Sequence, residues 1–180
     1  IGVDWPVRYE DIAPWYDYVE RFAGIAGNAD GLSQLPDGVF QPAFALTCAE
    51  EDFKSRVESA FPGRNVIAAR VAHLTAATEE QRALGRSNCR ARNRCEHGCV
   101  YKAYFSSLNA TLPAAQRTGN LTMVHNAIVQ SLDYDPATAR VTGVRVIDAE
   151  TKQRRVYTAR VVFLNASTIA SAMILLQSTS

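Results

Sequence analysis

Apolar residues near the start of the chain recur at the spacing of a helix. They fall three or four residues apart, at Ile12, Trp15, Tyr16, Val19, Phe22 and Ile25. This spacing predicts an amphipathic helix over residues 12–23, which Gly24 and Gly27 would end. The aromatic side chains on its apolar face are expected to pack in a core.

The pattern changes several times over the next hundred residues. A second helix is predicted over residues 48–61, before the Pro62–Gly63 turn, and a third over residues 106–116. Between them, the apolar run VIAARVAHL indicates a strand over residues 65–74. Residues 28–46, which are rich in turn formers, are predicted to form a loop.

After residue 120 the pattern becomes that of β-structure. Strands are predicted over residues 121–132, 141–147 and 154–164, with turns between them. The last strand ends in four apolar residues, 161–164, a run typical of a strand buried on both faces. A small polar turn and an apolar helix over residues 169–177 follow. A buried strand, a small turn and a helix are how doubly wound domains present a nucleotide site, so we predict an α/β chain, in detail an α+β fragment.

Composition and charge narrow the range of functions. With 180 residues, of which 47% are hydrophobic, the chain can build one ordinary core. A formal net charge of +1 gives no overall field that favours nucleic acid or a membrane surface. The first residues contain neither an initiator Met nor a signal-peptide pattern, and the last ones stop within an apolar run. We therefore expect an internal part of a longer protein.

Three of the four cysteines stand close together, and this array carries the strongest chemical signal. Cys89, Cys95 and Cys99 form a C-x5-C-x3-C pattern among several basic residues, Arg86, Arg90, Arg92, Arg94 and Lys102. Positive neighbours favour the thiolate form, which is the form that binds metals.

The cysteine spacing alone does not choose the metal. A structural zinc would need a fourth ligand, from His97 or from the more distant His73, His125 or Cys48. An iron–sulfur cluster held by three cysteines needs no fourth ligand. Two further interpretations of the array remain: the cysteines are free thiols, or two of them form a disulfide.

The order of segments resembles that of a known family. ATLPAAQRTGNLTMVHNAIV (110–129), DPATARVTGVRV (135–146) and ARVVFLNASTIASAMILL (159–176) are similar to the middle of the glucose–methanol–choline (GMC) family of FAD-dependent oxidoreductases. DWPVRYEDIAPWYDYVERFAGIAG (4–27) looks like the helix between the family's FAD-binding and substrate regions. The resemblance implies three parts: a helical connecting region (1–63), a cysteine-containing loop region (64–109) and the central part of the FAD-binding domain (110–180).

The cysteine spacing is similar to that of one branch, the flavoprotein subunits of bacterial sugar, gluconate and fructose dehydrogenases. In that branch the three cysteines hold a 3Fe–4S cluster that carries electrons from flavin to a cytochrome partner. The resemblance thus implies that the cluster ligands are Cys89, Cys95 and Cys99. It also implies that the substrate is a sugar, polyol or sugar acid, which is oxidised at a CH–OH group. The implied partners are a cytochrome c-type subunit and small accessory subunits. The resemblance further implies a periplasmic place beside the inner membrane, although the residues themselves assign no compartment. Val100, Tyr101 and Lys102 depart from the residues that follow the last cysteine in that branch.

The resemblance also implies an FAD site. Val129 matches the position whose backbone N–H and C=O hold the adenine edge, and Ala166 and Ser167 match the small turn that passes close to the dinucleotide. The family's G-x-G-x-x-G is expected before Ile1 and its catalytic histidine beyond Ser180, so no residue of this chain is assigned as catalytic. Two rivals remain: the same family without a cluster, acting as an oxidase, and a zinc-stapled nucleic-acid-binding module using Cys89, Cys95, His97 and Cys99. If the chain is a member of the GMC family, no nucleic-acid partner is expected.

Overall fold

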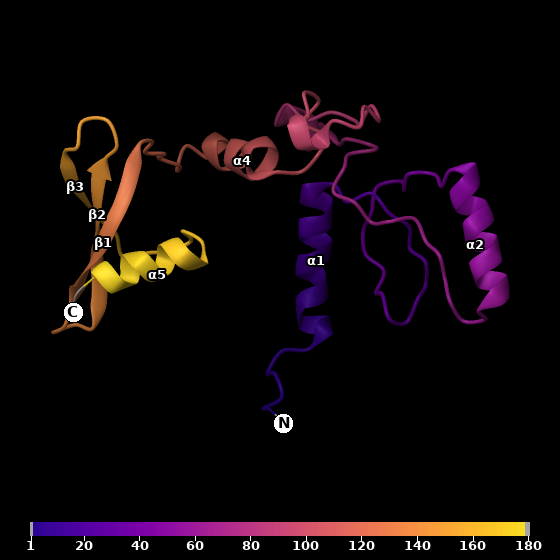
Figure 1. The fold of residues 1–180 in the computed structure, drawn as a ribbon, viewed down its shortest axis with the longest axis horizontal. Helices are drawn as coiled ribbons and strands as arrows, with labels where there is room; N and C mark the ends of the chain where they lie inside the picture. Colours follow the sequence, from indigo (N-terminus) through magenta and orange to yellow (C-terminus); the bar gives the residue numbers. More distant parts are fainter. Residues whose placement is uncertain (1, 179–180) are drawn as a thin grey trace. The chain divides into compact units, whose positions relative to one another are not determined.

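The computed structural model describes residues 2–178, and the chain divides into two compact units after Leu121 (Figure 1). The first unit is mostly helix and irregular chain, and the second contains the sheet. The three-part division expected from the sequence stays a prediction. No helix among the described residues is long and apolar enough to cross a membrane.

The first unit contains short helices separated by long connections. Its elements are α1 (Tyr9–Ala23), α2 (Cys48–Ala60), α3 (Glu79–Ala83), the 3₁₀ turn η1 (Cys95–His97), the π-type turn η2 (Ser107–Thr111) and α4 (Leu112–Arg117). α1 and α2 begin and end within three residues of the predicted helices. The N-terminus of α2 is fixed locally, because Thr47 and Glu50 form a capping box. The five-residue helix α3 was not predicted.

The aromatic face of α1 does not lie in a core, so that prediction is wrong for the described residues. The side chain of Trp15 is 69% exposed and that of Tyr16 is 55% exposed. Only the end of the helix is buried, at Ala23. A period of 3.6 residues shows that a helix has an apolar face, but it does not say what covers that face.

The predicted strand at residues 65–74 is also wrong, because this segment pairs one residue at a time with two different partners. Val71 exchanges both backbone hydrogen bonds with Ala26, at 2.8 and 2.9 Å. His73 forms an isolated bridge with Tyr104. A strand needs a continuous partner, and here the chain instead crosses from one neighbour to the next. The crossing buries Leu74 in a small core with Ala77 and Ala103.

The second unit is a three-stranded antiparallel sheet in the order β1-β2-β3, with α5 (Thr168–Gln177) packed on β1. The strands are β1 (Ala127–Asp135), β2 (Arg140–Asp148) and β3 (Arg154–Thr158). Leu132, Val146 and Ile174 are its buried apolar side chains. The backbone N–H of Leu132 donates to Ser178 Oγ at 2.8 Å, which ties the end of α5 to the edge strand. This mixture of helices and antiparallel strands confirms the α/β fragment predicted from the sequence.

The predicted strand does not continue to residue 164. β3 ends at Thr158, and residues 161–164 are irregular, with Val161 66% exposed and Phe163 82% exposed. A buried strand needs neighbours that satisfy its backbone groups, and in the described sheet no strand pairs with this run. The prediction of a strand buried on both faces is therefore wrong for the described residues.

Gly24 ends α1 in a place where no side chain fits. Its φ is +77°, and a Cβ built there would lie 2.1 Å from Leu74 Cδ2 and 2.9 Å from Gln81 Nε2. We expect Gly24→Ala to lower the free energy of unfolding by about 2–4 kcal/mol, from the left-handed backbone and the overpacked core together. Gly31→Ala is the matched control: its φ is +65° but nothing lies within 4 Å, so about 1–2 kcal/mol is expected. Urea unfolding midpoints of the whole protein measure the loss of stability in both variants. Equal losses would contradict the predicted clash between the added methyl group and Leu74.

Candidate metal centre and flavin-binding segment

The loop that carries the cysteines is closed at its base by hydrogen bonds. The backbone N–H and the hydroxyl of Ser87 both donate to Tyr101 O, at 2.9 and 3.1 Å. The N–H of Cys89 donates to Leu74 O at 2.7 Å, which fixes the first cysteine to the buried core. Cys89, Cys99 and Tyr101 all pack against that core. The two ends of the loop are therefore held side by side.

The buried guanidinium of Arg86 also holds the base of the cysteine loop, by hydrogen bonds to two neighbouring segments. The residue is only 1% exposed, and its four hydrogen bonds all go to backbone carbonyl oxygens. Two of these belong to the end of α1, Phe22 O and Ala23 O, and two to the returning chain, Lys102 O and Ala103 O. The C-terminal carbonyls of a helix have no intrahelical donors and carry partial negative charge, so they suit a cation.

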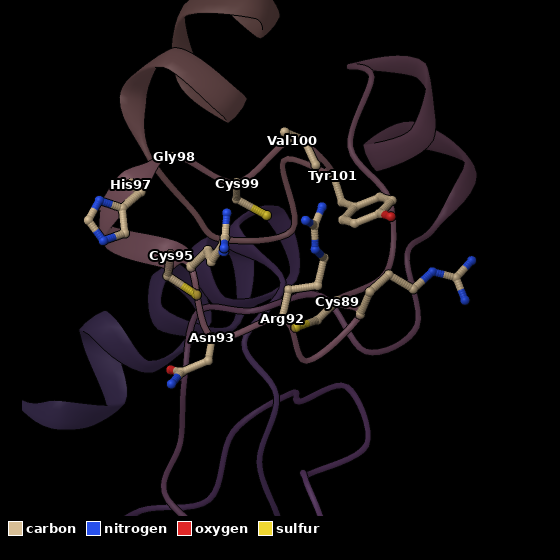
Figure 2. Close-up of a pocket in the computed structure, with 11 residues that line it drawn as sticks. Cys89, Arg92, Asn93, Cys95, His97, Gly98, Cys99, Val100 and Tyr101 are labelled. Carbon is tan, nitrogen blue, oxygen red and sulfur yellow. The ribbon is translucent and has the colours of Figure 1, made fainter.

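The three predicted ligands meet around one cavity. Cys89, Cys95 and Cys99 are half-buried free thiols and line a cavity of about 210 Å³. Figure 2 shows their sulfur atoms facing the same space, while the imidazole of His97 points away from the three sulfurs. Three arginines also line the cavity, Arg90, Arg92 and Arg94. The structure thus brings together the three cysteines that the sequence singled out.

The surroundings of Cys99 favour its thiolate form. Burial raises the pKa of the Cys99 thiol, but the backbone N–H groups of residues 101–104 together outweigh it and leave that pKa lowered. The Sγ of Cys89 accepts a hydrogen bond from the N–H of Ala91 at 3.4 Å. Backbone amides aimed at sulfur are a recurrent feature of iron–sulfur sites, because they stabilise negative charge on the sulfur.

One contact of this centre could not be predicted from the sequence. His73 lies 22 residues before Cys95, and its Nε2 is 3.3 Å from Cys95 Sγ. Burial lowers the pKa of the His73 imidazole. The sequence offered His73 as a distant zinc ligand but gave no link to Cys95, because nothing in a local pattern connects the two residues.

The three cysteines do not form a ready-made site for a single metal ion. Around one zinc ion, four ligands converge at about 2.0–2.3 Å from the metal. Within residues 2–178 no three His, Cys, Asp or Glu side chains come close enough to share one ion. Iron atoms and bridging sulfides hold the thiolates of a cluster farther apart, so three cysteines around a cavity fit a cluster. His97, the fourth ligand of the zinc alternative, is turned away from the sulfurs.

The residues expected to bind FAD lie in the second unit. Val129 is half-buried on the edge strand β1, opposite Val146 of β2, at a point where the register of β1 shifts. Ala166 is half-buried and Ser167 is exposed, directly before α5. Ser167 has a φ of +66°, rare for a residue with a side chain, and its hydroxyl does not cap the helix. The first N–H groups of α5 are thus not occupied by the side chain that precedes them.

Comparison with known proteins agrees with the resemblance seen in the sequence. A family model described as GMC oxidoreductase matches residues 6–180. The match covers almost the whole chain and defines the class as FAD-dependent oxidoreductases. The chain belongs to the GMC oxidoreductase family, and it forms part of the domain with which that family binds FAD. No curated protein matches the chain significantly.

Proposed function

We propose that the chain is part of an FAD-dependent dehydrogenase that oxidises a CH–OH group of a sugar, polyol or sugar acid. Electrons leave its flavin one at a time through a 3Fe–4S cluster held by Cys89, Cys95 and Cys99. The observation that carries the proposal is the single cavity lined by all three cysteines in a chain of the GMC family.

In this proposal the cysteine loop binds the cluster and balances its charge. Cys89, Cys95 and Cys99 supply the thiolates, and the cluster, when bound, accepts and donates single electrons between flavin and an outside acceptor. Arg90, Arg92 and Arg94 place positive charge around this anionic group. Cations near a metal–thiolate group stabilise its more reduced state, so these side chains favour electron uptake.

The proposed contacts to FAD come from residues of the second unit. A strand-edge residue such as Val129 can offer its backbone N–H and C=O to a nucleotide base without regard to side-chain identity. Ala166 and Ser167 are small, which lets a dinucleotide approach the backbone closely. The positive end of α5 that follows suits a phosphate group.

The catalytic base belongs outside this chain in the proposal. His73 contacts Cys95 and packs beside Tyr104, and His97 lines the cavity with its ring pointing away from the three sulfurs. Neither histidine is assigned as a base acting on a substrate alcohol. The electron acceptor is proposed to be a cytochrome c-type subunit on the periplasmic side.

The test is the cofactor content of the whole protein, purified without oxygen. We expect one FAD, about three irons and about four acid-labile sulfides per chain, and a low-temperature EPR signal of an oxidised 3Fe–4S cluster. Flavin without iron would leave the rival oxidase, with ordinary thiols. Zinc in place of iron would contradict the proposed cluster and favour the alternative of a zinc-stapled nucleic-acid-binding module.

A further inference from the structure

We propose that His73 is a positioning residue of the metal centre, which donates an Nε2–H hydrogen bond to Cys95 Sγ and thereby raises the reduction potential of the group bound there. The proposal rests on the proposed cluster. It assigns a function to a residue that lies outside the cysteine pattern and that is not a metal ligand.

The ring of His73 is held in place from several sides. Its backbone is fixed by the bridge to Tyr104 and by the neighbouring Leu74 N–H, which donates to Ala103 O at 3.1 Å. The ring lies 5.1 Å from that of Tyr104, tilted by 45°, and 6.4 Å from that of Phe44, edge on. An imidazole packed in this way presents Nε2 to Cys95 Sγ at 3.3 Å with little freedom to turn.

The hydrogen-bonding groups decide which ring nitrogen carries the proton. A neutral imidazole has one N–H, and a metal-bound thiolate can only accept a hydrogen bond. Nδ1 of His73 is buried, with no hydrogen-bond partner among the described residues. A proton on Nδ1 would leave a buried donor unpaired and would set two lone pairs against each other at 3.3 Å. A proton on Nε2 satisfies the donor and leaves only an acceptor unpaired, which proteins tolerate better.

A hydrogen bond to a ligand sulfur matters more when the cluster gains an electron. The added negative charge is shared with the thiolates, so a donor at Cys95 stabilises the reduced state more than the oxidised state. Removing the donor should shift the reduction equilibrium about tenfold toward the oxidised state. For a one-electron couple this is a fall in midpoint potential of about 59 mV.

The experiment is an EPR-monitored redox titration of the whole protein, with iron and sulfide measured in each sample. His73→Phe removes the donor but keeps a planar ring, and His73→Gln keeps an N–H donor at about the same reach. His97→Phe is the matched control, because it removes a histidine of the same loop whose ring points away from the sulfurs. We expect a lower potential in His73→Phe alone, with wild-type values in His73→Gln and His97→Phe.

The other outcomes separate the role of His73 from the proposed function of the chain. A full cluster with an unchanged potential in His73→Phe would overturn the role of His73 and leave the proposed function standing. Loss of the cluster in His73→Phe, with a wild-type potential in His73→Gln, would support the need for a donor. Loss of the cluster in both variants would overturn the proposal, because an imidazole itself would then be required. Wild-type protein without iron would refute the proposed function and the role of His73 together.

Discussion

Under the proposed function, Cys95→Ala is expected to yield a protein that retains FAD, lacks the iron–sulfur signal and cannot pass electrons to the proposed acceptor subunit. Cys95 begins the turn η1, lines the cavity with the other two cysteines and contacts His73. A cluster with three protein thiolates has no spare ligand, and alanine offers none. The expected loss is the whole proposed cluster, with flavin still reduced by substrate because the residues proposed to bind FAD lie in the other unit.

The control for this variant is Cys48→Ala. Cys48 is the fourth cysteine, exposed at the start of α2 and not part of the cavity. Iron, sulfide and flavin content of the two variants, followed by stopped-flow reoxidation of the reduced protein, separate the two roles. Equal iron content in wild type and Cys95→Ala would remove Cys95 from the ligand set, and iron loss in Cys48→Ala would show that the assignment of the ligands is wrong.

Arg86→Met is expected to destabilise the first unit strongly, although it nearly keeps the volume of the side chain. Methionine replaces the aliphatic part of the arginine side chain, but it leaves the carbonyl oxygens of Phe22, Ala23 and Lys102 without the guanidinium donor. A buried carbonyl without a donor costs about 1–3 kcal/mol, so a loss of about 3–9 kcal/mol is expected for the three together. Burial lowers the pKa of Arg86, but a guanidinium stays charged at pH 7.

Arg82→Met is the matched control for Arg86→Met. Arg82 lies four residues earlier on α3 and is exposed, so its replacement should change stability by less than about 0.5 kcal/mol. Hydrogen exchange of the whole protein adds a local readout, since the N–H groups of Leu74 and Cys89 should lose protection in Arg86→Met. Unchanged protection at both amides would show that the guanidinium does not hold the base of the loop. Arg86→Lys, with one compact head group, should give an intermediate loss.

Sequence reasoning succeeded where the determinants of structure are local. The start of α2 and the turn between β1 and β2 depend on residues a few positions apart. α2 begins at Cys48, the predicted residue, and a turn follows β1 as predicted. It failed at residues 65–74 and 161–164, because a strand exists only if a partner strand supplies its hydrogen bonds. The cysteine pattern indicated the centre, but the contact between His73 and Cys95 spans 22 residues and left no trace in the local pattern.

The loop between the cysteines combines a fixed base with a strained span, and this has a consequence for cofactor assembly. Between the cysteines, Ala91 and Asn93 have φ values of 49° and 51°, a backbone conformation that costs about 1–2 kcal/mol for most residues with a side chain. This strain favours opening of the span between the cysteines, while the hydrogen bonds of Arg86 and Ser87 keep its two ends in place. Under the proposed function, this arrangement suits delivery of a preassembled cluster to a protein that has already folded.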